Sequence, residues 1–229
     1  MKNLILLHGA LGHPDVFIPY HEKLSGDFHI HTLLFSGHGN VDLPENGITI
    51  EQYTQELAIY IERESLKDVH LFGHSMGGYV ALCYALQNPK NVHSIITLGT
   101  KFDWTEEQAL KESKLLNAGV IAEKIPKYAE LLESQHGSKW KQLLPAVAEM
   151  MISLGKNPPL KGVVLDTIET PVQIMVGDQD QMVTIEESTA VYRNISNAKF
   201  AILPGTKHPM EKVRPGLLLS LMKDFWNFS

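Results

Sequence analysis

The chain has 229 residues, which fits one domain or one domain with a modest insertion. It is 44% hydrophobic and 20% charged, as in globular proteins with a full core, and its net charge of −6 argues against a nucleic acid or an anionic membrane as a partner. One cysteine excludes an internal disulfide, and no apolar run has the length of a signal peptide or a membrane span, so we expect a cytoplasmic protein.

Short apolar runs predict six strands, and several of them end in glycine. Runs of this kind are typical of strands that are buried on both faces of a sheet. In chain order they cover residues 3–9, 28–35, 68–73, 92–99, 171–177 and 198–205.

Segments with helical periodicity separate these strands. They cover residues 49–65, 76–88, 185–194 and 215–228. Thr49 is placed as an N-cap of the first helix, and Pro89 ends the second. The alternation predicts an α/β fold: a mostly parallel sheet of about six strands with helices on both faces. In such a sheet ligands bind beyond the carboxyl ends of the strands.

Residues 101–168 break this alternation, because they contain only amphipathic helical pieces, around 106–116, 118–134 and 140–154. A plain connection between two strands is rarely this long. We therefore expect a helical lid inserted after the fourth strand, over a core domain made of residues 1–100 and 169–229. An enlarged crossover connection is the alternative.

The third strand ends in a G-x-S-x-G pattern, Gly73-His74-Ser75-Met76-Gly77, and a helix follows it directly. A turn this sharp strains the serine backbone, and the two glycines remove side chains that would collide with the neighbouring strand and helix. The Ser75 hydroxyl then projects above the sheet near a helix N-terminus, where negative charge is stabilised. Ser75 is therefore a candidate nucleophile; a tight turn without chemistry is the alternative.

A serine nucleophile needs a base that takes its proton and an acid that orients the base. Asp178 and Asp180 follow the fifth predicted strand, and His208 follows the sixth. The order serine, acid, histidine is the one expected for this kind of strand-to-helix turn. Each residue alone is compatible with an ordinary loop position, but all three stand at the same edge of the predicted sheet.

Together these segments resemble the α/β-hydrolase superfamily, from Asn3 to about Trp226. In that family the acid often lies in G-x-x-D-x-x-V or -P, which fits residues 177–183 with Asp180 as the acid. The histidine commonly follows G-x-x-H, which fits His208. The resemblance thus implies Ser75, Asp180 and His208 as catalytic residues, with Asp178 as a solvated or turn-forming neighbour.

The resemblance also implies an oxyanion hole made of two backbone N–H groups. One belongs to Met76, and the other to Ala10 in the H-G-A-L-G loop, with Leu11 the less favoured donor. His8 resembles the buried structural histidine of the family, and His38 in S-G-H-G-N is expected to brace its loop.

The pocket is less well determined by the sequence. Its candidate residues are Leu11, Phe17, His74, Phe102, Trp104 and Met150. Basic residues that could hold a substrate carboxylate are Lys101, Lys124 and Lys127, and no pattern singles one out. Because His21, His29 and His31 have no acid or cysteine at ligand spacing, we expect no metal.

The resemblance implies a serine hydrolase that cleaves a small carboxylic ester or thioester through an acyl-enzyme, without a cofactor. The same fold and triad also serve C–C bond hydrolysis, elimination in quinone biosynthesis and cofactor-free haloperoxidase or perhydrolase chemistry. A slow-turnover ligand-binding or receptor protein is an alternative of another class. We expect a small-molecule substrate, no nucleic-acid or membrane partner, and a monomer or homodimer.

Overall fold

The computed structural model describes residues 1–227, apart from the side chain of Val163. Six parallel strands form one sheet in the order β2-β1-β3-β4-β5-β6. They are β1 (Lys2–Leu7), β2 (Phe28–Leu33), β3 (Val69–His74), β4 (Val92–Leu98), β5 (Val172–Gly177) and β6 (Ala198–Leu203). The six predicted strands and their parallel arrangement are therefore confirmed.

The register of the sheet aligns the carboxyl ends of its strands along one edge. Leu7 of β1 lies beside Gly73 of β3, and Gly177 of β5 lies beside Leu203 of β6. Every residue of β3 and β5 is buried, which explains why these strands are mostly apolar. The loops that carry the candidate site residues start at this common edge.

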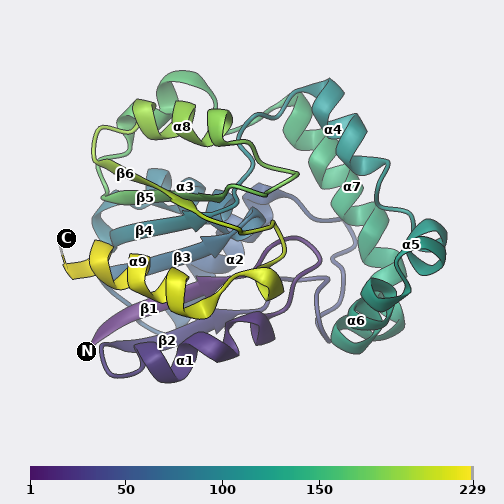
Figure 1. Ribbon diagram of the computed structural model, residues 1–229, viewed down its shortest axis with the longest axis horizontal. Helices are drawn as coiled ribbons and strands as arrows, with labels where there is room; N and C mark the ends of the chain where they lie inside the picture. Colours follow the sequence, from purple (N-terminus) through teal and green to yellow (C-terminus); the bar gives the residue numbers. More distant parts are fainter. Residues whose placement is uncertain (228–229) are drawn as a thin grey trace.

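Helices cover both faces of the sheet (Figure 1). One core cluster contains residues from α1 (Ile18–Leu24) and α9 (Pro215–Asn227), together with Leu4 and Leu6 of β1. The other contains residues from α2 (Ile50–Arg63), α3 (Met76–Gln87) and α8 (Ile185–Asn194), together with Ile5 and Leu7. Because successive strand side chains point to opposite faces, the two clusters lie on the two sides of the sheet.

The helix signals in the sequence correspond to local contacts. Thr49 is extended and its side chain accepts a hydrogen bond from the Gln52 N–H, so the predicted N-cap of α2 is confirmed. Helix α1 was not among the predicted elements. Short 3₁₀ helices lie at Pro14–Phe17, Pro89–Asn91, Gly137–Lys139, Gly162–Thr167 and Met210–Lys212.

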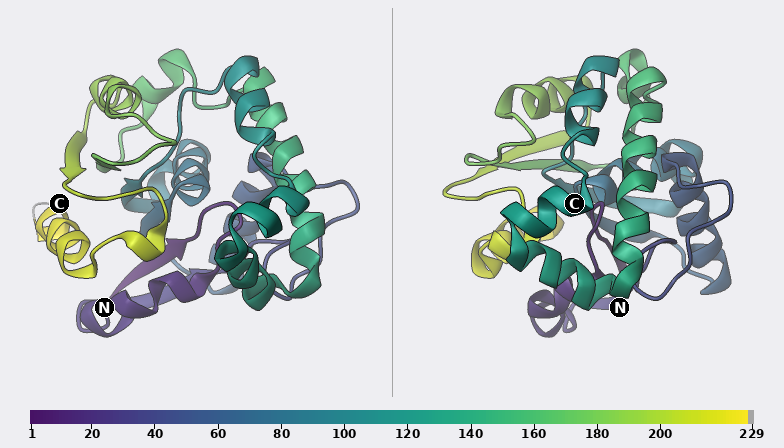
Figure 2. Two further views of the ribbon diagram at one scale, coloured as in Figure 1. Left: turned by 45° about the vertical axis from the view of Figure 1, so that its right-hand side comes forward. Right: turned by 90° about the vertical axis from the view of Figure 1, so that its right-hand side faces the viewer.

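The segment between β4 and β5 forms a separate helical layer beyond the carboxyl ends of the strands (Figures 1 and 2). Its helices are α4 (Glu106–Ser113), α5 (Ala118–Lys124), α6 (Pro126–His136) and α7 (Trp140–Lys156). The predicted helical piece 118–134 is two helices, because Ile125 precedes a proline and leaves the helical conformation, with φ −135° and ψ 60°. Pro145, in contrast, lies inside α7 without ending it.

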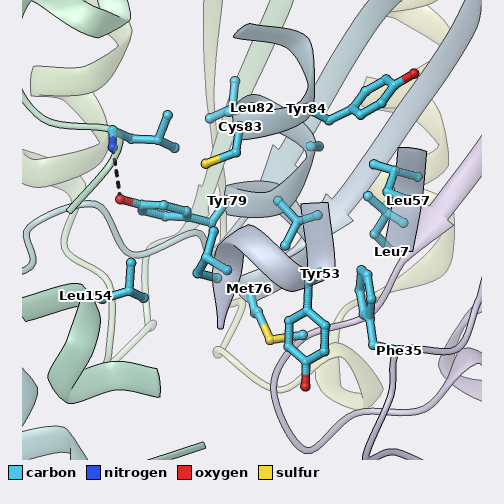
Figure 3. Close-up of a cluster of buried hydrophobic side chains, with 14 of the residues drawn as sticks. Leu7, Phe35, Tyr53, Leu57, Met76, Tyr79, Leu82, Cys83, Tyr84 and Leu154 are labelled. Atoms are coloured by element: carbon cyan, nitrogen blue, oxygen red, sulfur yellow. Dashed lines mark hydrogen bonds between the residues drawn. The ribbon is translucent and has the colours of Figure 1, made fainter. Parts of the chain in front are cut away.

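The helical layer packs on the core through α3. Met76 and Tyr79 of α3, Tyr53 of α2 and Leu154 of α7 belong to one buried cluster, part of which Figure 3 shows. The Leu160 N–H donates a hydrogen bond of 3.2 Å to the Tyr79 hydroxyl, the dashed line in Figure 3. The chain that leaves α7 is thereby attached to the helix that follows Ser75.

None of the helices within residues 1–227 combines the length and the apolar composition that crossing a membrane requires.

Candidate active site

Ser75 lies at a sharp turn between β3 and α3. Its backbone has φ 51° and ψ −116°, a conformation that non-glycine residues rarely adopt and that costs on the order of 1–3 kcal/mol. A Cβ on Gly73 would overlap the Gly77 backbone, and a Cβ on Gly77 would overlap the Leu7 carbonyl. The two glycines are therefore required by close contacts with the helix and with β1, as predicted for a strained serine turn. The Thr100 hydroxyl also donates to the Ser75 carbonyl at 2.9 Å.

His208 and Asp180 form a hydrogen-bonded pair at the same edge of the sheet. The distance from His208 Nδ1 to Asp180 Oδ2 is 2.8 Å, and the Asp180 side chain is only 2% exposed. Burial raises the pKa of Asp180, but His208 and the N–H groups of Val183 and Met182 outweigh it and lower this pKa below its ordinary value. The carboxylate is therefore held ionised beside the imidazole.

Asp178 lies on the same loop but does not contact His208. Its Oδ1 accepts a hydrogen bond of 3.1 Å from the Thr206 N–H, and the residue is exposed. It braces the loop after β5 against the loop after β6. Of the two acids that the sequence offers, the structure places Asp180 beside the histidine.

Ser75 and His208 line one cavity of about 40 Å³. Within residues 1–227 no hydrogen bond joins Ser75 Oγ to the His208 ring, whose Nδ1 is used by Asp180. Such bonds are often long in free enzymes and shorten when substrate binds. The other residues that line the cavity are Ala10, Ile50, Met76, Tyr79, Lys101, Trp104, Met150, Met151, Leu154 and Met182.

The backbone N–H groups of two residues that line this cavity are unpaired within residues 1–227. Among the described residues, the N–H groups of Ala10 and Met76 have no protein acceptor. The Leu11 N–H, in contrast, donates to His38 Nε2 at 3.2 Å. Of these two neighbouring N–H groups, the one of Leu11 is therefore already paired and the one of Ala10 is not.

A family model described as the alpha/beta hydrolase fold matches residues 2–112. The parallel six-stranded sheet agrees with it across the whole chain. The chain has the α/β-hydrolase fold.

The relatives of this α/β hydrolase are lipases, esterases and other hydrolases. It is 25% identical to monoacylglycerol lipase ABHD6 of Homo sapiens over an alignment of 259 residues, gaps included. The alignment covers 97% of this chain and 74% of that protein. It is 22% identical to 2-(acetamidomethylene)succinate hydrolase of Mesorhizobium japonicum, over 97% of this chain and 87% of that protein. A solved esterase from Thermogutta terrifontis has a TM-score of 0.81 at 20% identity, over 100% and 90% of the two chains. These likenesses support a hydrolase, and the structural one shows the fold.

Two histidines of the hydrolase are buried and neutral. His8 Nε2 accepts from the Phe35 N–H and its Nδ1–H donates to the Gly9 carbonyl, so burial can lower its pKa to about 4. Burial also lowers the pKa of His38 well below its ordinary value. Both rings brace loops, which agrees with the roles expected from the sequence.

His136, at the end of α6, is a buried residue that the sequence did not single out. Its Nδ1 accepts a hydrogen bond of 2.8 Å from the Gly39 N–H, and its Nε2–H donates to the Leu11 carbonyl at 3.1 Å. The ring therefore joins the helical layer to the loop that contains Ala10. No local pattern indicates such contacts, because the partners are 97 and 125 residues away.

His74 is not among the residues that line the cavity with Ser75. Its Nε2–H donates to the backbone carbonyl of His208 at 2.9 Å, and burial lowers its pKa to about 3. A neutral ring that holds the backbone of the loop is a structural part, not a base.

Some of the remaining pocket candidates line the cavity with Ser75 and others do not. Trp104 and Met150 line the cavity with Ser75. Phe17 does not, because it lies on the other side of the sheet, with its ring centroid 5.9 Å from that of Phe72. Leu11 and Phe102 are buried in the core cluster of α2 and α3 instead.

The lining also includes residues that the sequence did not suggest for the pocket. Ile50 begins α2, Tyr79 lies in α3, and Met182 follows Asp180. Of the three lysines considered, Lys101 lines the cavity, whereas Lys124 and Lys127 are exposed on α5 and α6.

Proposed function

We propose that the protein is a serine hydrolase that cleaves small carboxylic esters or thioesters through an acyl-enzyme. The observation that carries this proposal is the 2.8 Å hydrogen bond between His208 and Asp180 at a cavity that Ser75 also lines. The α/β-hydrolase fold, the match of residues 2–112 to the family model, and the esterase and lipase relatives support it.

In the proposed mechanism Ser75 Oγ attacks the substrate carbonyl carbon while His208 Nε2 takes the serine proton. Asp180 accepts the Nδ1–H bond, which leaves Nε2 as the basic nitrogen and stabilises the imidazolium that forms. His208 then gives the proton to the leaving alcohol or thiol. A water molecule, deprotonated by the same nitrogen, releases the acid from Ser75.

The negative charge that develops on the carbonyl oxygen requires hydrogen-bond donors that already point toward it. The N–H groups of Ala10 and Met76 are the proposed donors, since both residues line the cavity and neither N–H has an acceptor among the described residues. Met76 also begins α3, and a helix N-terminus favours negative charge.

We assign the helical layer, residues 101–168, the role of a lid over the core domain of residues 1–100 and 169–229. Trp104, Met150, Met151 and Leu154 come from this segment and close one side of the cavity. A lid of apolar side chains limits bulk solvent around the reacting groups, while the single water molecule that hydrolyses the acyl-enzyme must still enter.

The size of the cavity supports a small acyl group. A volume of about 40 Å³ is far below the roughly 300–1,000 Å³ of sites that enclose drug-sized ligands. The proposal therefore favours short acyl chains over the long chains of lipids.

Hydrolysis of p-nitrophenyl esters with acyl chains from two to twelve carbons tests this function. We expect the highest kcat/KM with the shortest chains, and a loss of about 10⁴-fold or more in kcat on Ser75→Ala. A folded protein that hydrolyses none of these esters, or a Ser75→Ala variant as active as its parent, would overturn the proposal.

A further inference from the structure

Lys101 is the one lysine, arginine, aspartate or glutamate among the described residues that line the cavity with Ser75 and His208. It stands in the connection from β4 to α4, and its side chain is 10% exposed. Removing an ammonium group from water is costly unless partners compensate its charge. The groups that contact the Lys101 ammonium therefore indicate whether its charge and its N–H donors are used within the protein or remain for a ligand.

The protein partners of Lys101 leave most of its hydrogen-bonding capacity free. Its Nζ donates to the Met182 carbonyl at 3.2 Å, and Glu187 Oε2 lies at 3.7 Å, too far for a hydrogen bond. An ammonium group has three N–H donors. Within residues 1–227, one of the three is used.

Glu187 does not need Lys101 as a hydrogen-bond partner. Its Oε1 accepts from the Phe102 N–H at 2.9 Å and the Asp103 N–H at 3.3 Å. Its Oε2 accepts from the Thr184 N–H at 3.2 Å, as part of the capping box that begins α8. Because these donors satisfy the carboxylate, Glu187 holds Lys101 in place by charge while the lysine keeps donors for a ligand.

The surroundings strengthen any interaction that Lys101 makes with an anion. Trp104 and Met182 lie beside it in a cavity lined mainly by apolar side chains. Charges attract more strongly where water is scarce, because the effective dielectric constant is lower there. A neutral substrate leaves the spare donors unpaired, whereas an anionic group pairs them.

We propose that Lys101 binds a carboxylate of the substrate, so that the preferred substrates are short esters or thioesters carrying a carboxylate a few carbons from the scissile carbonyl. This proposal rests on the proposed hydrolase function, because it assigns a specificity residue to the same cavity. It makes Lys101 the residue that selects acidic acyl groups.

The test compares two p-nitrophenyl esters of similar length, the neutral butyrate and the monoester of glutarate, which carries a terminal carboxylate. The measured quantity is selectivity, the ratio of kcat/KM for the glutarate ester to that for the butyrate ester. We expect this ratio to fall by about 10-fold or more in Lys101→Met, mainly through KM, since a charge-assisted hydrogen bond is lost. Lys101→Arg should retain most of it, and Lys111→Met, an exposed lysine on α4, should retain all of it.

A second measurement does not depend on turnover. Glutarate binding to the Ser75→Ala variant, measured by calorimetry, should weaken by a similar factor when Lys101→Met is added. A selectivity ratio that is the same in the parent and in Lys101→Met, with glutarate binding also unchanged, overturns the proposal and leaves the hydrolase function intact. Hydrolysis of neither ester overturns the hydrolase function, and glutarate binding then decides separately whether Lys101 is an anion site.

Discussion

At the scale of single residues, Ser75 differs from an ordinary loop serine by its backbone. A positive φ is tolerated because Gly73 and Gly77 allow the strand, the turn and α3 to approach closely. The strain keeps the hydroxyl at the cavity, where His208 also lies. The free energy spent on this turn is therefore consistent with a functional position.

Asp180→Asn tests the role of the acid. An amide at this position can donate to His208 Nδ1, which favours the wrong tautomer of the imidazole. We expect kcat for p-nitrophenyl acetate to fall by about 10⁴-fold, with the midpoint of urea unfolding close to that of the parent protein.

The matched control is Asp178→Asn, whose carboxylate contacts the Thr206 N–H instead of the imidazole. We expect its kcat to stay within roughly threefold of the parent. If the Asp178 variant lost more activity than the Asp180 variant, the assignment of the acid would be reversed.

At the scale of elements, the helical layer and the loop after β1 are joined by the side chain of His136. The ring bonds the Leu11 carbonyl on one side and the Gly39 N–H on the other, and it is 2% exposed. Leu11 directly follows Ala10, the proposed oxyanion donor. The contact thus couples the position of α6 to the geometry of the active site.

Replacing His136 by alanine should loosen this coupling. Two buried backbone groups lose their partner, so we expect the free energy of unfolding to fall by roughly 2–4 kcal/mol and kcat to fall with it. Urea denaturation and ester hydrolysis measure the two effects. His29→Ala, at an exposed position on β2, is the control and should change neither. Unchanged stability and unchanged kcat in His136→Ala would refute the coupling.

The residues that could be predicted from the sequence are those with local signals. Ser75 has glycines at fixed offsets, and His208 follows a strand that ends near a glycine, so strand order alone brings both to one edge. Phe17 was misplaced because the predicted elements include neither the 3₁₀ helix Pro14–Phe17 nor α1, whose buried residues pack together on the other face of the sheet. The contacts of His136 could not be predicted at all, because they depend on how separate helices pack.

At the scale of the whole molecule, many histidines are folded in their neutral form. Burial is the first cause that lowers the pKa of His8, His31, His38, His70, His74 and His136. In the unfolded chain these groups bind protons below about pH 6.5. The unfolded state therefore binds more protons than the folded state in mildly acidic solution, and acid favours unfolding.

The free energy of unfolding should accordingly be highest above pH 6.5 and decrease as the pH falls toward 4. For His8 alone, a pKa shift from 6.5 to about 4 corresponds to roughly 3 kcal/mol over that interval. Urea denaturation at pH 7.5, 6.5, 5.5 and 4.5 measures the slope. Between pH 7.5 and 5.5 ordinary carboxyl groups do not titrate, so a change in this interval reports on the histidines. A free energy of unfolding that stays constant over this interval would contradict the assignment of neutral buried histidines.

In the proposed mechanism His208 and Asp180 activate Ser75 as a nucleophile. The most direct measurement is mass spectrometry of the folded protein after reaction with a fluorophosphonate, followed by peptide mapping. We expect one adduct per chain, on Ser75, which forms far more slowly in His208→Gln and is absent in Ser75→Ala. A folded protein that forms no adduct, or forms it on another residue, would contradict it.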